Sequence, residues 1–83
     1  MKKSLRDFRI GEKGYVKSVN AEGKIKRRLY DMGVTPGANI LLCKVAPLGD
    51  PIEVTIRGYQ LSLRKNEAEK ILMEIADEVR TNG

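Results

Sequence analysis

Histidine is absent from this chain of 83 residues, and so is tryptophan. A serine or cysteine nucleophile usually needs a neighbouring base, and histidine is the commonest one. Ser4, Ser18 and Ser62 therefore lack the usual catalytic partner. No spacing of carboxylates or lysines replaces it, so we expect the chain not to be an enzyme and to need no cofactor.

Metal ligands are also scarce, because Cys43 is the only cysteine. Structural zinc takes four Cys or His ligands and catalytic zinc takes three protein ligands. We expect Cys43 to be a small buried hydrophobic residue in an apolar strand. Asp50, Glu53 and Glu67 are scattered carboxylates that could bind a divalent cation only weakly. A lone cysteine forms no internal disulfide, which favours the cytoplasm.

Long apolar runs are missing too. No stretch approaches the roughly 20 residues of a membrane-spanning helix, so we expect no membrane insertion. The basic start Met1–Lys3 is not followed by the apolar region of a secretory signal. The length fits one domain over residues 1–83, with residues 77–83 as a frayed tail.

Positive charge is what the chain has in excess, with a net charge of +5 that lies in its first half. Residues 1–44 carry eleven Lys and Arg against four Asp and Glu, whereas residues 45–83 carry five against seven. The densest cluster is Lys24–Arg28. It could be a solvated helix face, a nucleic-acid contact beside Tyr15, Tyr30 and Tyr59, or a protein-docking helix.

Two turn-rich clusters, residues 32–37 and 46–51, divide the middle of the chain because Pro cannot lie inside a central strand. Around them, the patterns predict a turn at 11–14 and strands at 15–19, 38–45, 52–57 and 60–64. Residues 23–32 are predicted to be a helix with a buried stripe of Ile25, Leu29 and Met32, ended by Gly33.

The C-terminal pattern allows two structures. A helix would bury an apolar face between Ala68 and Val79, with Asn66 and Glu69 arranged like a capping box. A strand at Ile71–Ile75 would instead alternate its side chains. The local pattern alone favours the helix.

Four segments in this order resemble the ferrous iron transport protein A (FeoA) family. They are Arg28–Gly37, Ala46–Ile52, Gly58–Lys65 and Glu67–Ala68. The resemblance implies a mostly β fold, a small SH3-like β-barrel of about five strands with one short inserted helix. It also implies a helical turn at residues 67–70 and a closing strand at 71–75. We adopt that strand, because its absence would leave an open edge on a very small sheet.

The same resemblance implies a cytosolic accessory protein of bacterial ferrous iron uptake. Its partner would be the cytoplasmic part of the ferrous iron permease, a membrane protein with a GTP-binding domain, which could recruit it to the inner face of the membrane. A similar fold forms the C-terminal domain of metal-dependent repressors of the diphtheria toxin repressor type. We expect no attached helix-turn-helix domain, and therefore do not expect a complete repressor.

We predict that the partner is bound by exposed residues of the helix and of the second turn-rich cluster. Leu29 and Met32 are assigned to the core instead. Reversing the charge of Arg27 and Arg28 should then weaken binding without unfolding the barrel. Two alternatives are a small basic nucleic-acid-binding barrel, although no nucleic acid is expected, and a metal-responsive regulatory module. The predicted partner-binding residues are Lys26, Arg27, Arg28, Tyr30, Pro47, Leu48, Gly49 and Asp50.

Overall fold

Six strands, two helices and one 3₁₀ turn make up residues 1–75, the part of the chain that the computed structural model describes. In chain order these are β1 (Lys2–Ser4), the 3₁₀ turn η1 (Leu5–Asp7), β2 (Lys13–Val19), α1 (Gly23–Asp31), β3 (Asn39–Val45), β4 (Ile52–Ile56), β5 (Tyr59–Leu63), α2 (Lys65–Ala68) and β6 (Ile71–Ile75). The prediction of a mostly β fold with one short helix inserted between strands is confirmed.

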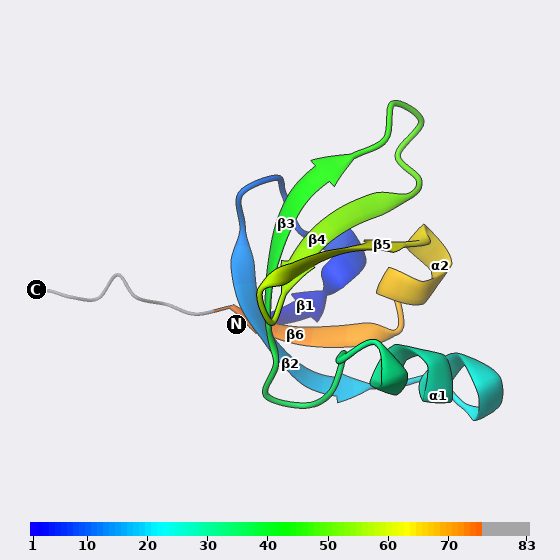
Figure 1. Ribbon diagram of the computed structural model, residues 1–83. Helices are drawn as coiled ribbons and strands as arrows, with labels where there is room; N and C mark the ends of the chain where they lie inside the picture. The colour runs from blue at the N-terminus through cyan, green and yellow to red at the C-terminus, as the bar shows by residue number, and fades with distance from the viewer. Residues whose placement is uncertain (76–83) are drawn as a thin grey trace, which may run out of the picture.

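The strands form one antiparallel sheet in the order β1-β6-β2-β3-β4-β5. The sheet curls around its core, and α1 projects from one end while the β3–β4 loop projects from the other (Figure 1). Irregular pairing within β2 and β3 adds to this curvature. The sheet has six strands instead of about five, because the prediction missed β1. Lys2–Ser4 has no apolar alternation, and pairing with β6 makes it a strand.

Alternating apolar residues build the core, as strand geometry requires. Val54, between Ile52 and Ile56 on β4, is fully buried, and all three side chains point inward. The other strands and the 3₁₀ turn add further buried side chains, among them Leu5, Val16, Ile40, Leu42, Leu63, Ile71 and Met73.

Strand alternation also corrects two local predictions. Cys43 is only partly buried, because Leu42 points inward and its neighbour falls on the outer face. There the Cys43 Sγ lies 3.1 Å from the Thr55 Oγ1. Gly14 lies within β2 and not in the turn that precedes it. A Cβ at Gly14 would lie 2.4 Å from the Glu74 carbonyl oxygen, so only glycine lets β6 approach this closely.

The closing strand β6 is confirmed, and the helical alternative is wrong as far as residue 75. Ile71 and Met73 are fully buried and pair with β2, so tertiary contacts override the helical periodicity. The helical turn before β6 is α2, and its capping residue is Arg64 instead of the predicted Asn66. The Glu67 carboxylate accepts a hydrogen bond from the Arg64 N–H and so fixes this start. The predicted tail at residues 77–83 lies outside the described residues.

An acidic side chain fastens the N-terminal segment. The Glu12 carboxylate accepts hydrogen bonds from the Arg9 N–H (2.8 Å) and from the Lys3 ammonium (3.1 Å). The hydrogen bond from the Arg9 backbone N–H is the main cause that lowers the pKa of Glu12 below its ordinary value, and Lys3 adds to it.

This lowered pKa gives a pH prediction. A carboxylate whose pKa is lower in the folded state stabilises the fold above its unfolded pKa, and that stabilisation is lost as pH falls through the folded value. We expect Glu12→Gln to reduce stability at pH 7 but progressively less below pH 4.5. Urea denaturation of both proteins between pH 7 and pH 3 measures this. A stability difference that does not vary with pH would contradict it.

Candidate protein interaction surface

Helix α1 ends where the sequence predicts, in a Schellman motif. The Val34 N–H donates to the Leu29 carbonyl and the Gly33 N–H to the Tyr30 carbonyl, both at 2.9 Å. Gly33 has a φ of +93°, which favours glycine. Leu29 and Val34, the two apolar residues that this motif brings together, are both fully buried.

The rest of α1 is exposed. Leu29 is its only buried residue, and the helix extends beyond the barrel surface (Figure 1). The predicted stripe is therefore wrong for Ile25, which is 41% exposed, because the helix start lies beyond the sheet. Met32 is partly buried against the core, as expected.

The exposed surface of α1 is strongly basic. Lys24, Lys26 and Arg27 are exposed, and none of them forms an ion pair within residues 1–75. The Lys26 ammonium lies 5.7 Å from the centre of the Tyr30 ring, a cation–π contact that holds both side chains on this surface. A shallow hollow between Lys26, Arg27, Tyr30 and Asp31 completes it.

Arg28 differs from its neighbours because it binds the barrel. Its guanidinium donates to the carboxylate of Glu67 in α2, whose side chain is only 6% exposed. Glu67 is the only buried charged residue among the described ones. Arg28 therefore compensates a buried charge and fixes α1 to α2, although half of its own side chain remains exposed.

A second contact fixes the end of α1. The Arg57 guanidinium donates to the Gly33 carbonyl (3.2 Å) and to the Thr35 Oγ1 (3.0 Å), and the Tyr59 hydroxyl donates to the Met32 carbonyl. Arg57 lies in the β4–β5 turn, and Tyr59 is the first residue of β5. The C-terminal end of α1 is thus held by the sheet as well as by α2.

The β3–β4 loop is the other predicted binding segment. Its tip residue Leu48 is 95% exposed, as single apolar side chains on protein surfaces often are. The loop is held by hydrogen bonds from the Ala46 N–H to the Pro51 carbonyl (3.0 Å) and from the Gly49 N–H to the Ala46 carbonyl (2.7 Å). The Asp50 carboxylate accepts from the Lys65 N–H (2.9 Å), which joins the loop to α2.

The structure does not bring the eight predicted residues into one patch. Helix α1 and the β3–β4 loop project from opposite ends of the barrel, and α2 lies between them (Figure 1). Helix α2 contacts α1 through Glu67 and the loop through the Lys65 N–H. The prediction did not include this link, because a four-residue helix with no apolar stripe gives no periodic signal.

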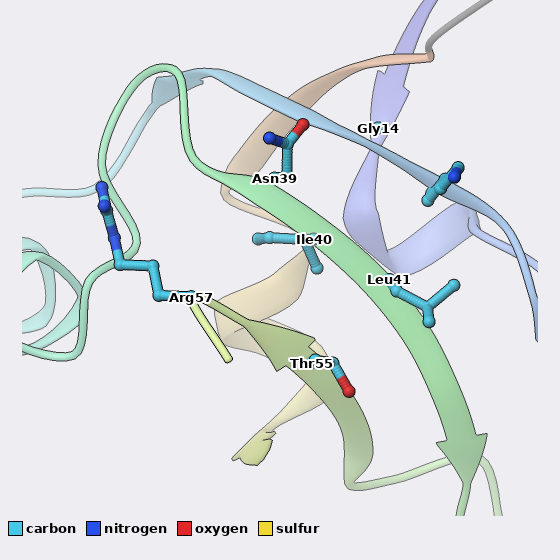
Figure 2. A pocket seen from close by; sticks show the side chains of 7 residues that line it. Gly14, Asn39, Ile40, Leu41, Thr55 and Arg57 are labelled. Carbon is cyan, nitrogen blue, oxygen red and sulfur yellow. The ribbon is translucent and has the colours of Figure 1, made fainter. Parts of the chain in front are cut away.

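A groove on the outer face of the sheet was also not predicted. It has a volume of about 610 Å³ and runs across β2, β3 and β4. Leu41 and Thr55 lie along it, and the Arg57 side chain points from its edge towards the loop before β3 (Figure 2). Its lining residues are Lys13, Gly14, Asn39, Ile40, Leu41, Thr55 and Arg57, which include no acidic side chain.

Two further kinds of site are absent from residues 1–75. No three Cys, His, Asp or Glu side chains gather closely enough to hold a metal ion there. None of the helices in this part of the chain has the length and apolar character needed to span a membrane.

The family model described as FeoA domain matches residues 3–75. A curated relative, the Fe(2+) transport protein A/Fe(2+) transporter FeoB fusion protein of Porphyromonas gingivalis, is 31% identical over 79 residues. The match covers 95% of this chain but only 9% of the fusion protein.

Among solved structures, the FeoA-like protein of Clostridium acetobutylicum superposes with a TM-score of 0.86 at 40% identity, covering 98% of this chain and 94% of that one. The zinc complex of Stenotrophomonas maltophilia FeoA, described as a prokaryotic SH3 domain protein, has a TM-score of 0.75 at 25% identity, covering 86% and 88%. A manganese-dependent transcriptional repressor shares the fold, with a TM-score of 0.84 at 19% identity over 90% of this chain and 37% of the repressor.

Proposed function

From the premise that this chain belongs to the FeoA domain family, with its SH3-like fold and its association with ferrous iron transport, we propose that it docks on the ferrous iron permease. It acts in the cytoplasm as an accessory protein, and the permease recruits it to the inner face of the membrane. The docking surface is the outward side of α1.

The fusion protein of Porphyromonas gingivalis supports the choice of partner. There a segment similar to this chain is part of the same polypeptide as a ferrous iron transporter. Covalent linkage keeps two domains at a high effective concentration, which is useful when the domains bind each other weakly. A separate chain of the same family has to find the permease through its own surface.

The observation that carries the proposal is the surface of α1. Three of its cations have no ion-pair partner within residues 1–75. The C-terminal end of the helix is fixed to the barrel, whereas its N-terminal end extends outward. A polar helix that buries one residue gains little from packing, so its exposed face is available for another protein. Arg and Tyr are typical anchors of such interfaces.

The expected mechanism is regulation by contact. A carboxylate-rich surface on the permease would bind Lys26, Arg27 and Tyr30, and binding would bias the nucleotide state or the gating of the permease. A helix fixed to α2 and to the β4–β5 turn transmits such a contact without bending, because its C-terminal half cannot move independently of the barrel.

We expect Arg27→Glu to weaken binding to the full-length permease in lipid nanodiscs at least tenfold, because it places a negative charge in the basic surface. Isothermal titration calorimetry measures the affinity. Lys17→Glu is the matched control, since it makes the same charge change on the exposed face of β2. Equal affinities for Arg27→Glu and the unmodified chain would remove α1 from the interface.

A further inference from the structure

Strand β5 forms one end of the sheet. It pairs with β4 on one side, and no strand within residues 1–75 pairs with its other side. The opposite end of the sheet is β1. In Figure 1, β5 crosses the front of the barrel, and no other element is drawn in front of it.

The backbone groups at this free edge follow from the β4–β5 turn. Arg57 and Gly58 both have positive φ (50° and 86°), the geometry of a two-residue hairpin turn. Ile56 and Tyr59 therefore form the hydrogen-bonded pair that closes the hairpin, and the pairing alternates from there. The N–H and C=O groups of Gln60 and Ser62 point away from β4. In the described chain they make no backbone hydrogen bond outside the sheet ladder.

Edge strands usually carry features that prevent pairing with another chain, such as charged residues, proline, bulges or a very short length. The β1 edge has two of them, because it spans three residues and contains Lys2 and Lys3. The β5 edge has none of these features. Tyr59–Leu63 is five residues long, contains no charged residue and no proline, and pairs with β4 without a bulge.

We propose that the free edge of β5 binds an extended peptide segment of a partner protein, which adds a strand to the sheet. The outward groups of Gln60 and Ser62 supply four backbone hydrogen bonds, as in other cases of strand addition. The segment carries acidic residues at its two ends, because exposed Arg57 and Arg64 flank β5. Neither arginine forms an ion pair within residues 1–75, and Arg57 donates only to neutral oxygens.

A second copy of this chain fits the same edge less well. Antiparallel pairing of two β5 edges would place Gln60 of one copy opposite Ser62 of the other. Continuing this register brings Arg57, in the β4–β5 turn of one copy, near Lys65, at the start of α2 in the other copy, and this happens at both ends. Like charges brought close together repel each other. The proposed edge therefore favours an acidic peptide over self-association.

This inference goes beyond the proposed function, because it involves neither α1 nor the identity of the permease. Its test uses the full chain and a synthetic nine-residue peptide of alternating valine and threonine with an aspartate at each end. We expect NMR titration to shift the Gln60 and Ser62 amides and to slow their hydrogen exchange at least tenfold. The same peptide with lysine ends should bind at least fivefold more weakly.

Two variants make the test specific. Ser62→Pro removes an outward N–H and should reduce peptide binding at least tenfold, whereas Ser62→Ala keeps the N–H and should bind normally. If Ser62→Pro does not fold, Arg64→Glu still decides: it keeps every edge donor, leaves one positive and one negative flanking charge, and should abolish the preference for the aspartate-ended peptide. The proposal would be overturned if the peptide left the Gln60 and Ser62 amides unshifted or shifted amides elsewhere in the chain instead. Dimers that protect these two amides without any peptide would also overturn it.

Discussion

Replacing Arg28 by glutamate is expected to lower the free energy of unfolding by about 3 kcal/mol, the largest effect that we predict for a surface residue. The wild-type guanidinium compensates the carboxylate of Glu67, which is almost fully buried. The substitution removes this partner and places a second negative charge beside the first. Urea denaturation at pH 7 measures the loss.

Arg27→Glu is the matched control, because it makes the same charge change one position earlier on an exposed side chain. We expect it to change stability by no more than about 0.5 kcal/mol, as is usual for a surface position. Similar stabilities for the two variants would show that the Arg28–Glu67 pair does not stabilise the fold. The structure therefore leads us to expect that reversing Arg27 and Arg28 together would destabilise the chain, contrary to the prediction from sequence.

The second large effect is expected for Leu29→Ala, at about 3 kcal/mol. Leu29 is the only buried residue of α1 and is fully buried, so truncation leaves a cavity where the helix meets the core. Part of the loss should be local. In the Leu29→Ala variant, we expect hydrogen exchange to speed up more for the amides of α1 than for those of β4, relative to the unmodified chain.

Ile25→Ala is the control on the same helix, because Ile25 lies outside the buried core and alanine is a better helix former. It should leave stability within about 0.5 kcal/mol of the unmodified chain. A large loss for Ile25→Ala, or a negligible one for Leu29→Ala, would contradict the way in which the structure attaches α1.

Features with a short-range cause could be predicted from the sequence. The alternation of Ile52, Val54 and Ile56 gives the inner face of β4, and Gly33 ends α1 because it alone adopts positive φ there without strain. Residues 52–57 were predicted as one strand, and the structure places only Arg57 in the following turn. Such patterns predict strands and helix ends correctly, because the residues that determine them are close together in the sequence.

Features that depend on distant contacts could not be predicted in this way. Lys2–Ser4 becomes a strand only because β6 lies beside it, and 71–75 had to be inferred from the family resemblance. The structural role of Arg28 was hidden because its partner Glu67 is 39 residues away along the chain. In the sequence, Arg28 resembles Arg27, and only the structure separates the residue that fastens the helix from the one proposed to bind the partner.

The same distinction applies to the predicted binding surface. Lys26, Arg27 and Tyr30 remain together on α1, whereas Pro47–Asp50 lies at the other end of the barrel (Figure 1). A partner that contacts both regions would have to span α2, so we assign the primary contact to α1.

Cross-saturation NMR of the labelled full-length chain bound to the full-length permease in nanodiscs tests the docking site most directly. Saturation of the permease should transfer to the amides of Lys26, Arg27 and Tyr30, and should leave those of Lys17 and the other outer residues of β2 unaffected. Transfer that is absent from α1 while the complex is formed would contradict the proposed interface.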